Sequence, residues 1–229
     1  MKFIVKESKC DLHIHTRFSD GQETIGYIID EAIKSGLKCI AFTDHNIDEA
    51  RFQFNRRELK KEYGLNVISG SELSVVYNGK RLHLLAYNYN SFFAKFILPK
   101  IGFMRDTGEP ISLKKACSLI HMCGGKAVLA HPFKYRYNGK GLVKDLVEEK
   151  CLDGIECIHS YHTQEEIDYL LEVCEKNNLY VSGGSDFHYC GKKIRGAGEQ
   201  CGISELTVTN STVEKQFERA KQKYKTIKR

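Results

Sequence analysis

The sequence predicts an α/β fold in which the strands close into an irregular barrel. Short apolar runs alternate with amphipathic segments along the 229 residues, a pattern typical of strands joined by helices. Imidazole and carboxylate side chains follow these runs, and in a barrel such positions meet at one rim. An open sheet would spread them along an edge, so the closed barrel is the better interpretation.

The apolar runs are the expected strands. Asn78-Gly79-Lys80 predicts a hairpin between Ser74–Tyr77 and Arg81–Tyr87, because Asn-Gly favours the tight turn that joins antiparallel strands. The other predicted strands are Leu37–Phe42, Asn66–Ser69, Ala127–Ala130, Gly154–Ile158 and Leu179–Ser182. Helical spacing of apolar residues fills the intervals. The predicted helices are Thr24–Lys34, Asp48–Tyr63, Ser112–Met122, Gly141–Glu149 and Gln164–Asn177.

Length and composition predict one domain over residues 1–229, with a motif-bearing core at about 10–190 and a C-terminal loop and basic helix at 191–229. The apolar stretches are too short to span a membrane, and we expect no signal peptide before Asp11. Nine cysteines without a Cys-x-x-Cys pair indicate buried thiols. These observations predict a cytoplasmic protein. The net charge of +6 gathers near the C-terminus, which is typical of a solvated helix and tail.

Nine side chains suited to binding divalent metals are distributed over this core. They are His13, His15, Asp20, His45, Glu72, His83, His131, Asp186 and His188. Residues two apart in a strand point the same way, so His13 and His15 can reach one pocket. A mixed imidazole and carboxylate set suits Zn, Mn or Fe better than Mg. So many ligands predict a site for more than one ion.

The order of these motifs resembles the PHP family, named for its polymerase and histidinol-phosphatase members. The resemblance is carried by His13-Ile14-His15, Asp20-Gly21, Asp44-His45, Glu72, His83, Ala130-His131-Pro132 and Asp186-Phe187-His188. It implies a distorted seven-stranded (βα) barrel, two or three divalent ions (Zn, Mn or Fe) and hydrolysis of phosphoesters. One implied ion uses His13, His15, Glu72 and Asp186, a second uses Glu72, His83 and His131, and a third uses Asp20, His45 and His188. Two such ions can share a hydroxide that attacks phosphorus.

Within the family, three segments are similar to the branch that acts on nucleoside monophosphates and short oligonucleotides. They are Ser71-Glu72-Leu73-Ser74, Gly154-Ile155-Glu156 and Ser160-Tyr161-His162-Thr163. That branch usually inserts a helical subdomain between the positions matching His83 and His131. Here only Asn88–Ile111 is available, which is too short for a full cap and predicts a more open site.

The resemblance also implies residues that contact the phosphate. Lys134 matches the position of a phosphate-binding arginine, with Arg136 as a close substitute, and the alternative is an exposed loop lysine. Arg17 and Arg195 are weaker candidates, each close to a metal-binding motif. His162 matches a position facing the pocket, from which it could contact phosphate or protonate the leaving alkoxide, and the alternative is a residue at a helix start.

Four further residues are expected to act indirectly or not at all. Asp11 and Asp44 adjoin candidate ligands, so we expect them to orient these ligands rather than bind metal. His121 and His159 are interpreted as incidental, since His121 belongs to an amphipathic helix.

Three functions remain open from the sequence. The first is hydrolysis of a small phosphomonoester such as a nucleoside 5′- or 3′-phosphate, with Asp186 and His162 as catalytic residues. The second is a 5′→3′ exonuclease or phosphodiesterase on short oligonucleotides. The third is a metal-binding module without catalysis. The expected partner is a small phosphorylated substrate, a nucleotide or a short oligonucleotide, and the oligomeric state stays open.

Overall fold

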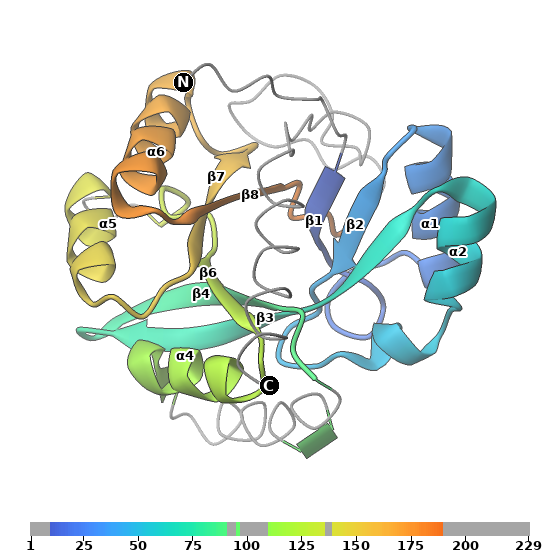
Figure 1. Cartoon of the computed structure of the whole chain (residues 1–229), viewed down its shortest axis with the longest axis horizontal. Coiled ribbons are helices and arrows are strands. Elements are labelled where there is room, and N and C mark those ends of the chain that lie inside the picture. Colours follow the sequence, from blue (N-terminus) through green and yellow to red (C-terminus); the bar gives the residue numbers. More distant parts are fainter. Residues whose placement is uncertain (1–9, 91–94, 97–109, 136–138, 190–229) are drawn as a thin grey trace, which may run out of the picture.

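The computed structural model describes residues 10–90, 95–96, 110–135 and 139–189, which build a nearly closed sheet with helices around it (Figure 1). Neighbouring strands follow the order β1-β2-β3-β4-β6-β7-β8, and the short β5 pairs with β3. Beyond β8, Phe187 meets the end of β1, where the His15 amide donates to the Phe187 carbonyl at 2.8 Å. This contact brings the two ends of the sheet together, so the predicted α/β barrel is confirmed.

Most neighbouring strands are parallel, but β4 runs antiparallel to both β3 and β6. The strands are β1 (Cys10–Ile14), β2 (Cys39–Phe42), β3 (Asn66–Tyr77), β4 (Lys80–Tyr87), β5 (Ile111–Ser112), β6 (Lys126–Leu129), β7 (Gly154–His159) and β8 (Tyr180–Gly184). The predicted hairpin turn reverses the chain at Asn78 and Gly79, both of which adopt positive φ. A helix therefore cannot separate β3 from β4, and the barrel departs here from a strict strand–helix alternation.

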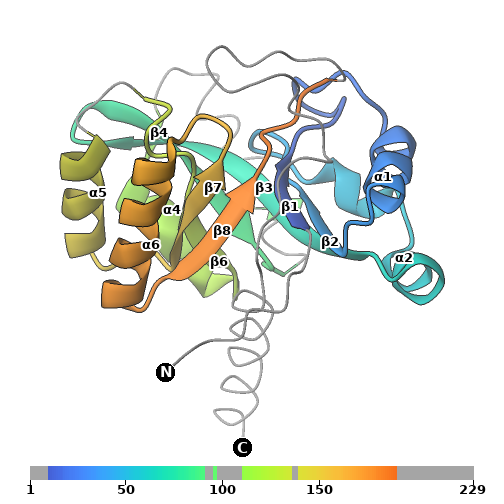
Figure 2. The ribbon, with the colours of Figure 1, turned by 90° about the horizontal axis from the view of Figure 1, so that it is seen from above.

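Figure 2 shows α1 and α2 on one side of the barrel and α4, α5 and α6 on the other. The helices are α1 (Ile25–Lys34), α2 (Arg56–Tyr63), α4 (Leu113–Met122), α5 (Gly139–Glu148) and α6 (Gln164–Asn177), with a 3₁₀ turn η1 at Glu49–Phe52. The single helix predicted over Asp48–Tyr63 is wrong. The Asn55 side chain accepts from the Arg57 and Glu58 amides, so it caps α2 and starts a new helix there.

Two close contacts with β1 hold the barrel interior together. The Tyr87 hydroxyl of β4 donates to the Leu12 carbonyl of β1 at 2.6 Å. Gly184 of β8 lies so close to His13 that an added Cβ would be 2.3 Å from the His13 Cβ, so only glycine fits there. Among the described residues no helix has the length and apolarity to cross a bilayer. Residues 191–229, Arg136 and Arg195 lie outside the described residues.

Candidate metal centre

The nine predicted metal-binding side chains converge at one end of the barrel, which we call the mouth. It lies where the parallel strands have their C-terminal ends. His15 and Asp20 follow β1, His45 follows β2, His131 follows β6, and Asp186 and His188 follow β8. The expectation that every ligand follows a strand is wrong for His13, Glu72 and His83, which lie within β1, β3 and β4.

The hairpin explains why Glu72 and His83 lie within strands. Pairing of β3 with β2 ends at Ser69, but β3 continues beyond that point as one arm of the β3–β4 hairpin. Glu72 belongs to this extension and still contacts the segment after β2, because its amide donates to the Asp44 carbonyl at 3.2 Å. His83 lies opposite Ser74 on the returning strand. The hairpin therefore brings two further side chains to the mouth.

The Glu72 carboxylate is the centre of this cluster. Five imidazole nitrogens face its oxygens: His13 Nε2 at 3.3 Å, His83 Nδ1 at 2.8 Å and His131 Nε2 at 3.0 Å from Oε1, and His15 Nε2 at 3.2 Å and His45 Nδ1 at 3.3 Å from Oε2. Burial alone would raise the pKa of Glu72, but attraction to the surrounding imidazoles lowers it well below the usual value. Glu72 is therefore an anion with both oxygens directed at ring nitrogens.

Two further carboxylates complete the cluster. Asp186 Oδ1 lies 3.4 Å from His13 Nε2 and 3.2 Å from His15 Nε2. Asp20 is 53% exposed and opens the cluster to solvent; its Oδ2 lies 3.5 Å from His45 Nε2 and 3.3 Å from His188 Nε2. Burial opposes the charge of each aspartate, but the neighbouring imidazoles lower both pKa values below the usual range. Both are anions at neutral pH.

The cluster has the donors that divalent metals require. Four buried ring nitrogens that face these carboxylates make no hydrogen bond with any described residue: His13 Nε2, His15 Nε2, His45 Nδ1 and His83 Nδ1. Leaving buried polar atoms unpaired is costly, and a cation between these nitrogens and the carboxylates would remove that cost. Two sets have ligand atoms within 4.8 Å of one another and could each hold an ion: His15, Asp20, His45 and His188, and His13, Glu72, His131 and Asp186. The residues therefore fit divalent metals.

A carboxylate in β7 orients two of the candidate ligands. The buried Glu156 lies with Oε1 3.1 Å from His13 Nδ1, and its Oε2 accepts from the His131 amide at 2.8 Å. A carboxylate on the far nitrogen of a metal-binding imidazole fixes the ring and its tautomer. From the sequence, Glu156 belongs only to the family-like segment Gly154-Ile155-Glu156. A carboxylate in the apolar run Gly154–His159 was the available signal.

Asp11 and Asp44 hold the loops that carry the candidate ligands. Asp44 accepts from the Thr16 amide, the Thr16 hydroxyl and the Ser19 hydroxyl, each at 2.7 Å. Asp11 accepts from the Ser185 amide at 3.0 Å and hydroxyl at 2.6 Å, and its burial raises its pKa to about 6. These contacts match the orienting role expected for both residues.

Lys134 lies at the cluster, where its ammonium donates to Asp186 Oδ2. The ammonium also lies 5.7 Å from the centroid of the Tyr161 ring. Burial would lower the pKa of Lys134, but attraction to Asp186 outweighs it and the pKa is raised. Lys134 is therefore a cation at the mouth rather than a lysine without local contacts.

His159, which the sequence leaves as incidental, lies beside the cluster. Its ring is buried, with Nε2 3.9 Å from Asp186 Oδ2 and the ring centroid 5.3 Å from that of His131. His162 lies behind His159 as seen from the cluster, with 5.4 Å between the two ring centroids. The His162 Nδ1 is 2.9 Å from the Cys157 carbonyl oxygen. His159 ends β7 at the same rim as the candidate ligands, and this position at a strand end is the sequence signal for it.

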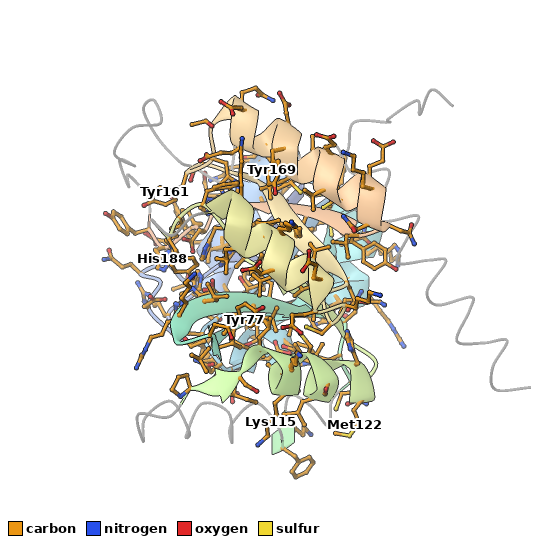
Figure 3. The ribbon with its side chains drawn as sticks, turned by 90° about the vertical axis from the view of Figure 1, so that its left-hand side faces the viewer. Tyr77, Lys115, Met122, Tyr161, Tyr169 and His188 are labelled. Atoms are coloured by element: carbon orange, nitrogen blue, oxygen red, sulfur yellow. The ribbon has the colours of Figure 1, made fainter. Side chains whose placement is uncertain are left out.

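The remaining predicted residues lie outside the cluster. Arg17 is exposed and its Nε donates to the Gln22 carbonyl at 2.6 Å. His121 faces Asp153 at the other end of the barrel, which agrees with its interpretation as incidental. Figure 3 shows Tyr161 and His188 on the same side of the molecule and Met122, at the end of α4, on the opposite side.

Comparison with known proteins gives a family and a fold. A model of the PHP domain matches residues 11–182. The chain is 23% identical to a 5′-3′ exoribonuclease of Haemophilus influenzae, covering 80% of this chain and 91% of that protein. It is 24% identical to a 3′,5′-nucleoside bisphosphate phosphatase of Chromobacterium violaceum, covering 82% and 90%. A solved structure from Bifidobacterium adolescentis, assigned as a metal-dependent phosphoesterase, has a TM-score of 0.72 at 21% identity and covers 93% of this chain and 96% of its own. At this identity the structural likeness shows the same fold.

Proposed function

We propose a reaction for this chain from one premise: it belongs to the PHP domain family, since the family model covers most of its length. The resemblance stated from the sequence is thereby confirmed, and the chain is a metal-dependent phosphoesterase. The reaction we propose is hydrolysis of the phosphomonoester of a nucleoside monophosphate. The observation that carries the proposal is the buried Glu72 carboxylate with imidazole nitrogens of five residues around it. The third hypothesis, a metal-binding module without catalysis, is set aside.

The nine residues at the mouth are the proposed ligands of two or three divalent ions, of Zn, Mn or Fe. We keep the predicted grouping of Asp20, His45 and His188, and we add His15, whose Nδ1 lies 3.4 Å from Asp20 Oδ1. Glu72 would be shared between ions because its two oxygens face different imidazoles. Bound there, the ions would supply a nucleophile from water at neutral pH and neutralise charge on the phosphoryl oxygens.

Lys134 and Asp186 are proposed to position the phosphoryl group beside the ions. Asp186 faces His13 and His15 through Oδ1 and receives Lys134 at Oδ2, so it links the ligand cluster to a cation outside it. Lys134 would bind a phosphoryl oxygen as a point charge. Arg136 and Arg195, predicted as further phosphate contacts, stay proposals of the sequence alone.

His159 is a better proposed phosphate contact than His162. The contact between His162 Nδ1 and the Cys157 carbonyl requires a proton on Nδ1, since a carbonyl oxygen only accepts. Burial lowers the pKa of His162, so Nε2 then carries a lone pair rather than a proton for a leaving alkoxide. His162 is therefore assigned a supporting role behind His159 in place of the catalytic role predicted for it.

A second candidate is removal of nucleotides from the 5′ end of short oligonucleotides. It is favoured by the Haemophilus influenzae relative, which is a 5′-3′ exoribonuclease, and by the half-exposed Asp20 at the mouth. We also propose a cytoplasmic location, where thiols stay reduced, because Cys157 and Cys174 lie 3.5 Å apart as free thiols.

The test is phosphate release by the protein reconstituted separately with Zn, Mn and Fe(II). The substrates are adenosine monophosphate, adenosine 3′,5′-bisphosphate, ribose 5-phosphate and a 5′-phosphorylated pentanucleotide. The proposal expects the highest kcat/KM on a mononucleotide. A preference for the pentanucleotide, with release of mononucleotides, would support the second candidate. Absence of hydrolysis with every metal and substrate would contradict both.

A further inference from the structure

A second cavity lies beside the mouth, and the proposed reaction does not use it. We call it the loop cavity. It has a volume of about 410 Å³. Its lining consists of Thr16, Arg17 and Phe18 of the β1–α1 loop, Thr24, Ile25, Gly26 and Ile29 at the start of α1, and Gln53 and Phe54 after η1. A cavity of this size is within the range of sites for small organic ligands, roughly 300–1,000 Å³.

The loop cavity adjoins the metal cluster through one loop. Thr16 directly follows His15, and its amide and hydroxyl both donate to Asp44. The same loop contacts the segment that follows β8, because the Gln22 amide donates to the His188 carbonyl at 2.7 Å. Figure 2 shows this loop beside the segment that follows β8. A ligand whose phosphate reaches the cluster through the exposed side at Asp20 could place its other end in the loop cavity.

The lining of the loop cavity suits a flat ring with polar edges. Phe18 is 41% exposed. The Phe54 ring lies 5.4 Å from the Phe42 ring and 5.8 Å from the Arg56 guanidinium, measured from its centroid, so Phe18 is the more accessible ring. The Arg17 guanidinium is held by the Gln22 carbonyl, and Thr24 and Gln53 add a hydroxyl and an amide. Aromatic rings with cationic and polar neighbours are the usual platform for nucleobases. A sugar or an amino alcohol alone would leave the rings unused.

A neighbouring groove between α1 and α2 carries acidic side chains. This helix groove, of about 450 Å³, lies between α1 and α2 and shares Ile29 and Phe54 with the loop cavity. Its lining includes three carboxylates, those of Asp30, Glu58 and Glu62, and one ammonium, that of Lys34. The Lys34 ammonium forms an ion pair with Glu31 at 2.8 Å. The lining carboxylates oppose a phosphate placed directly against them, and α2 also carries Arg56, Arg57, Lys60 and Lys61 outside the lining.

We infer that the loop cavity binds the nucleobase of a nucleotide whose phosphate lies at the metal cluster, and that the helix groove disfavours longer chains. The inference rests on the proposed function, and it selects mononucleotides over oligonucleotides as substrates. It assigns specificity to Phe18 and Gln53, which lie outside the metal cluster.

The first experiment compares Phe18→Ala with a matched control, Phe52→Ala. Phe52 is an exposed phenylalanine on η1 that does not line the loop cavity. Loss of one stacked ring should lower kcat/KM for adenosine monophosphate by about 5- to 100-fold. Hydrolysis of ribose 5-phosphate, which has no base, should not change, and Phe52→Ala should change neither. An equal fall on both substrates, or no fall on the nucleotide, would overturn the inference.

The second experiment needs no hydrolysis, so it separates failure of the inference from failure of the proposed function. Photolabelling of the full-length protein with 8-azidoadenosine, mapped by mass spectrometry, should mark the peptides carrying Phe18 or Phe54. Adenosine should prevent this labelling and ribose should not. Labelling elsewhere, or labelling that ribose prevents equally, would overturn the inference even if the wild-type protein hydrolyses nucleotides.

The third experiment tests the helix groove. The double variant Glu58→Gln, Glu62→Gln removes two exposed carboxylates and should raise kcat/KM for a 5′-phosphorylated pentanucleotide relative to adenosine monophosphate by several-fold. High salt should reduce this difference, because screening acts on exposed charges. An unchanged ratio would overturn the assignment of chain-length selection to the groove.

Discussion

The two ends of the barrel use the same kinds of side chain in opposite ways. At the end away from the mouth, Asp153 accepts from His121 Nε2 at 2.6 Å, from Lys126 Nζ at 2.7 Å and from the Ala127 amide at 2.9 Å. This carboxylate has its partners within the chain. At the mouth, carboxylates face four imidazole nitrogens that are buried and have no hydrogen bond among the described residues: His13 Nε2, His15 Nε2, His45 Nδ1 and His83 Nδ1.

The difference shows which end is built for stability and which for binding. Positive φ occurs at both ends, at His131 and Asp186 of the mouth and at Lys150 and Asn178 of the opposite end, so it does not separate them. The unpaired buried nitrogens do, because such groups are costly unless a ligand satisfies them. The mouth therefore depends on an added cation, whereas the opposite end does not.

The largest expected effect is loss of turnover in Asp186→Asn. This change removes the charge that faces His13, His15 and Lys134 but keeps the shape and tolerates positive φ. Turnover should fall by more than about 100-fold, since even partners that only orient a ligand cost 10- to 100-fold. Urea unfolding should show a small change in stability. Turnover within a few-fold of wild type, at equal metal content, would contradict the role of Asp186.

Glu156→Gln should weaken metal binding without abolishing it. Gln keeps the contact with the His131 amide but loses the charge beside His13, so metal affinity should fall by about 10- to 100-fold. Competition with a chromogenic chelator measures this, and excess metal should restore turnover. Glu149→Gln is the matched control, because Glu149 pairs with Lys114 outside the mouth. Equal metal affinity in both variants would remove Glu156 from the site.

Lys134→Ala should raise KM for phosphomonoesters by about tenfold, the usual order for a charged hydrogen bond. Lys140→Ala is a close control because the two lysines have similar aromatic neighbours. The Lys140 ammonium lies 5.3 Å from the Tyr169 ring centroid, and the Lys134 ammonium lies 5.7 Å from the Tyr161 ring centroid. Steady-state kinetics on both variants would compare the two. The same KM in both would return Lys134 to the alternative of an ordinary loop lysine.

The smallest effect concerns the opposite end and its dependence on pH. Burial alone would raise the pKa of Asp153, but hydrogen bonds from His121, Ala127 and Lys126 outweigh it and lower the pKa below its usual value. A carboxyl whose pKa is lower in the folded state stabilises the fold at neutral pH and loses this effect as pH falls through the folded-state pKa. Asp153→Asn should therefore lower the unfolding free energy by about 1 kcal/mol at pH 7. The difference in unfolding free energy between wild type and Asp153→Asn should become smaller below about pH 4. Urea titrations that show the same difference at every pH would contradict this explanation.

Local signals in the sequence were sufficient for much of this architecture. Asn78-Gly79 specified the hairpin, and His13-Ile14-His15 specified two imidazoles directed to one side of a strand. Their convergence with His131 and His188 followed from the rule that parallel strands share a rim. These predictions depend on short-range chemistry and on one topological rule.

Other features required the three-dimensional arrangement. The position of Glu72 depends on how far β3 extends past its pairing with β2, which no local pattern specifies. The roles of Glu156 and His159 depend on which rings they face across the barrel. The loop cavity joins Phe18 and Phe54, which belong to separate elements. Contacts between distant segments are the part that spacing along the chain does not encode.

The most direct measurement is titration of metal-free protein with Mn²⁺ or Zn²⁺, following bound metal per chain and the unfolding midpoint in wild type and Glu72→Gln. Wild-type protein should bind two or three ions, and it should gain about 2.7 kcal/mol in stability for each ion at a free metal concentration a hundred times the Kd of that site. Glu72→Gln should lose most of both effects, since five imidazoles then lack their shared anion. Wild-type protein that binds no ion, or a variant that binds as many ions with the same stabilisation, would contradict the account.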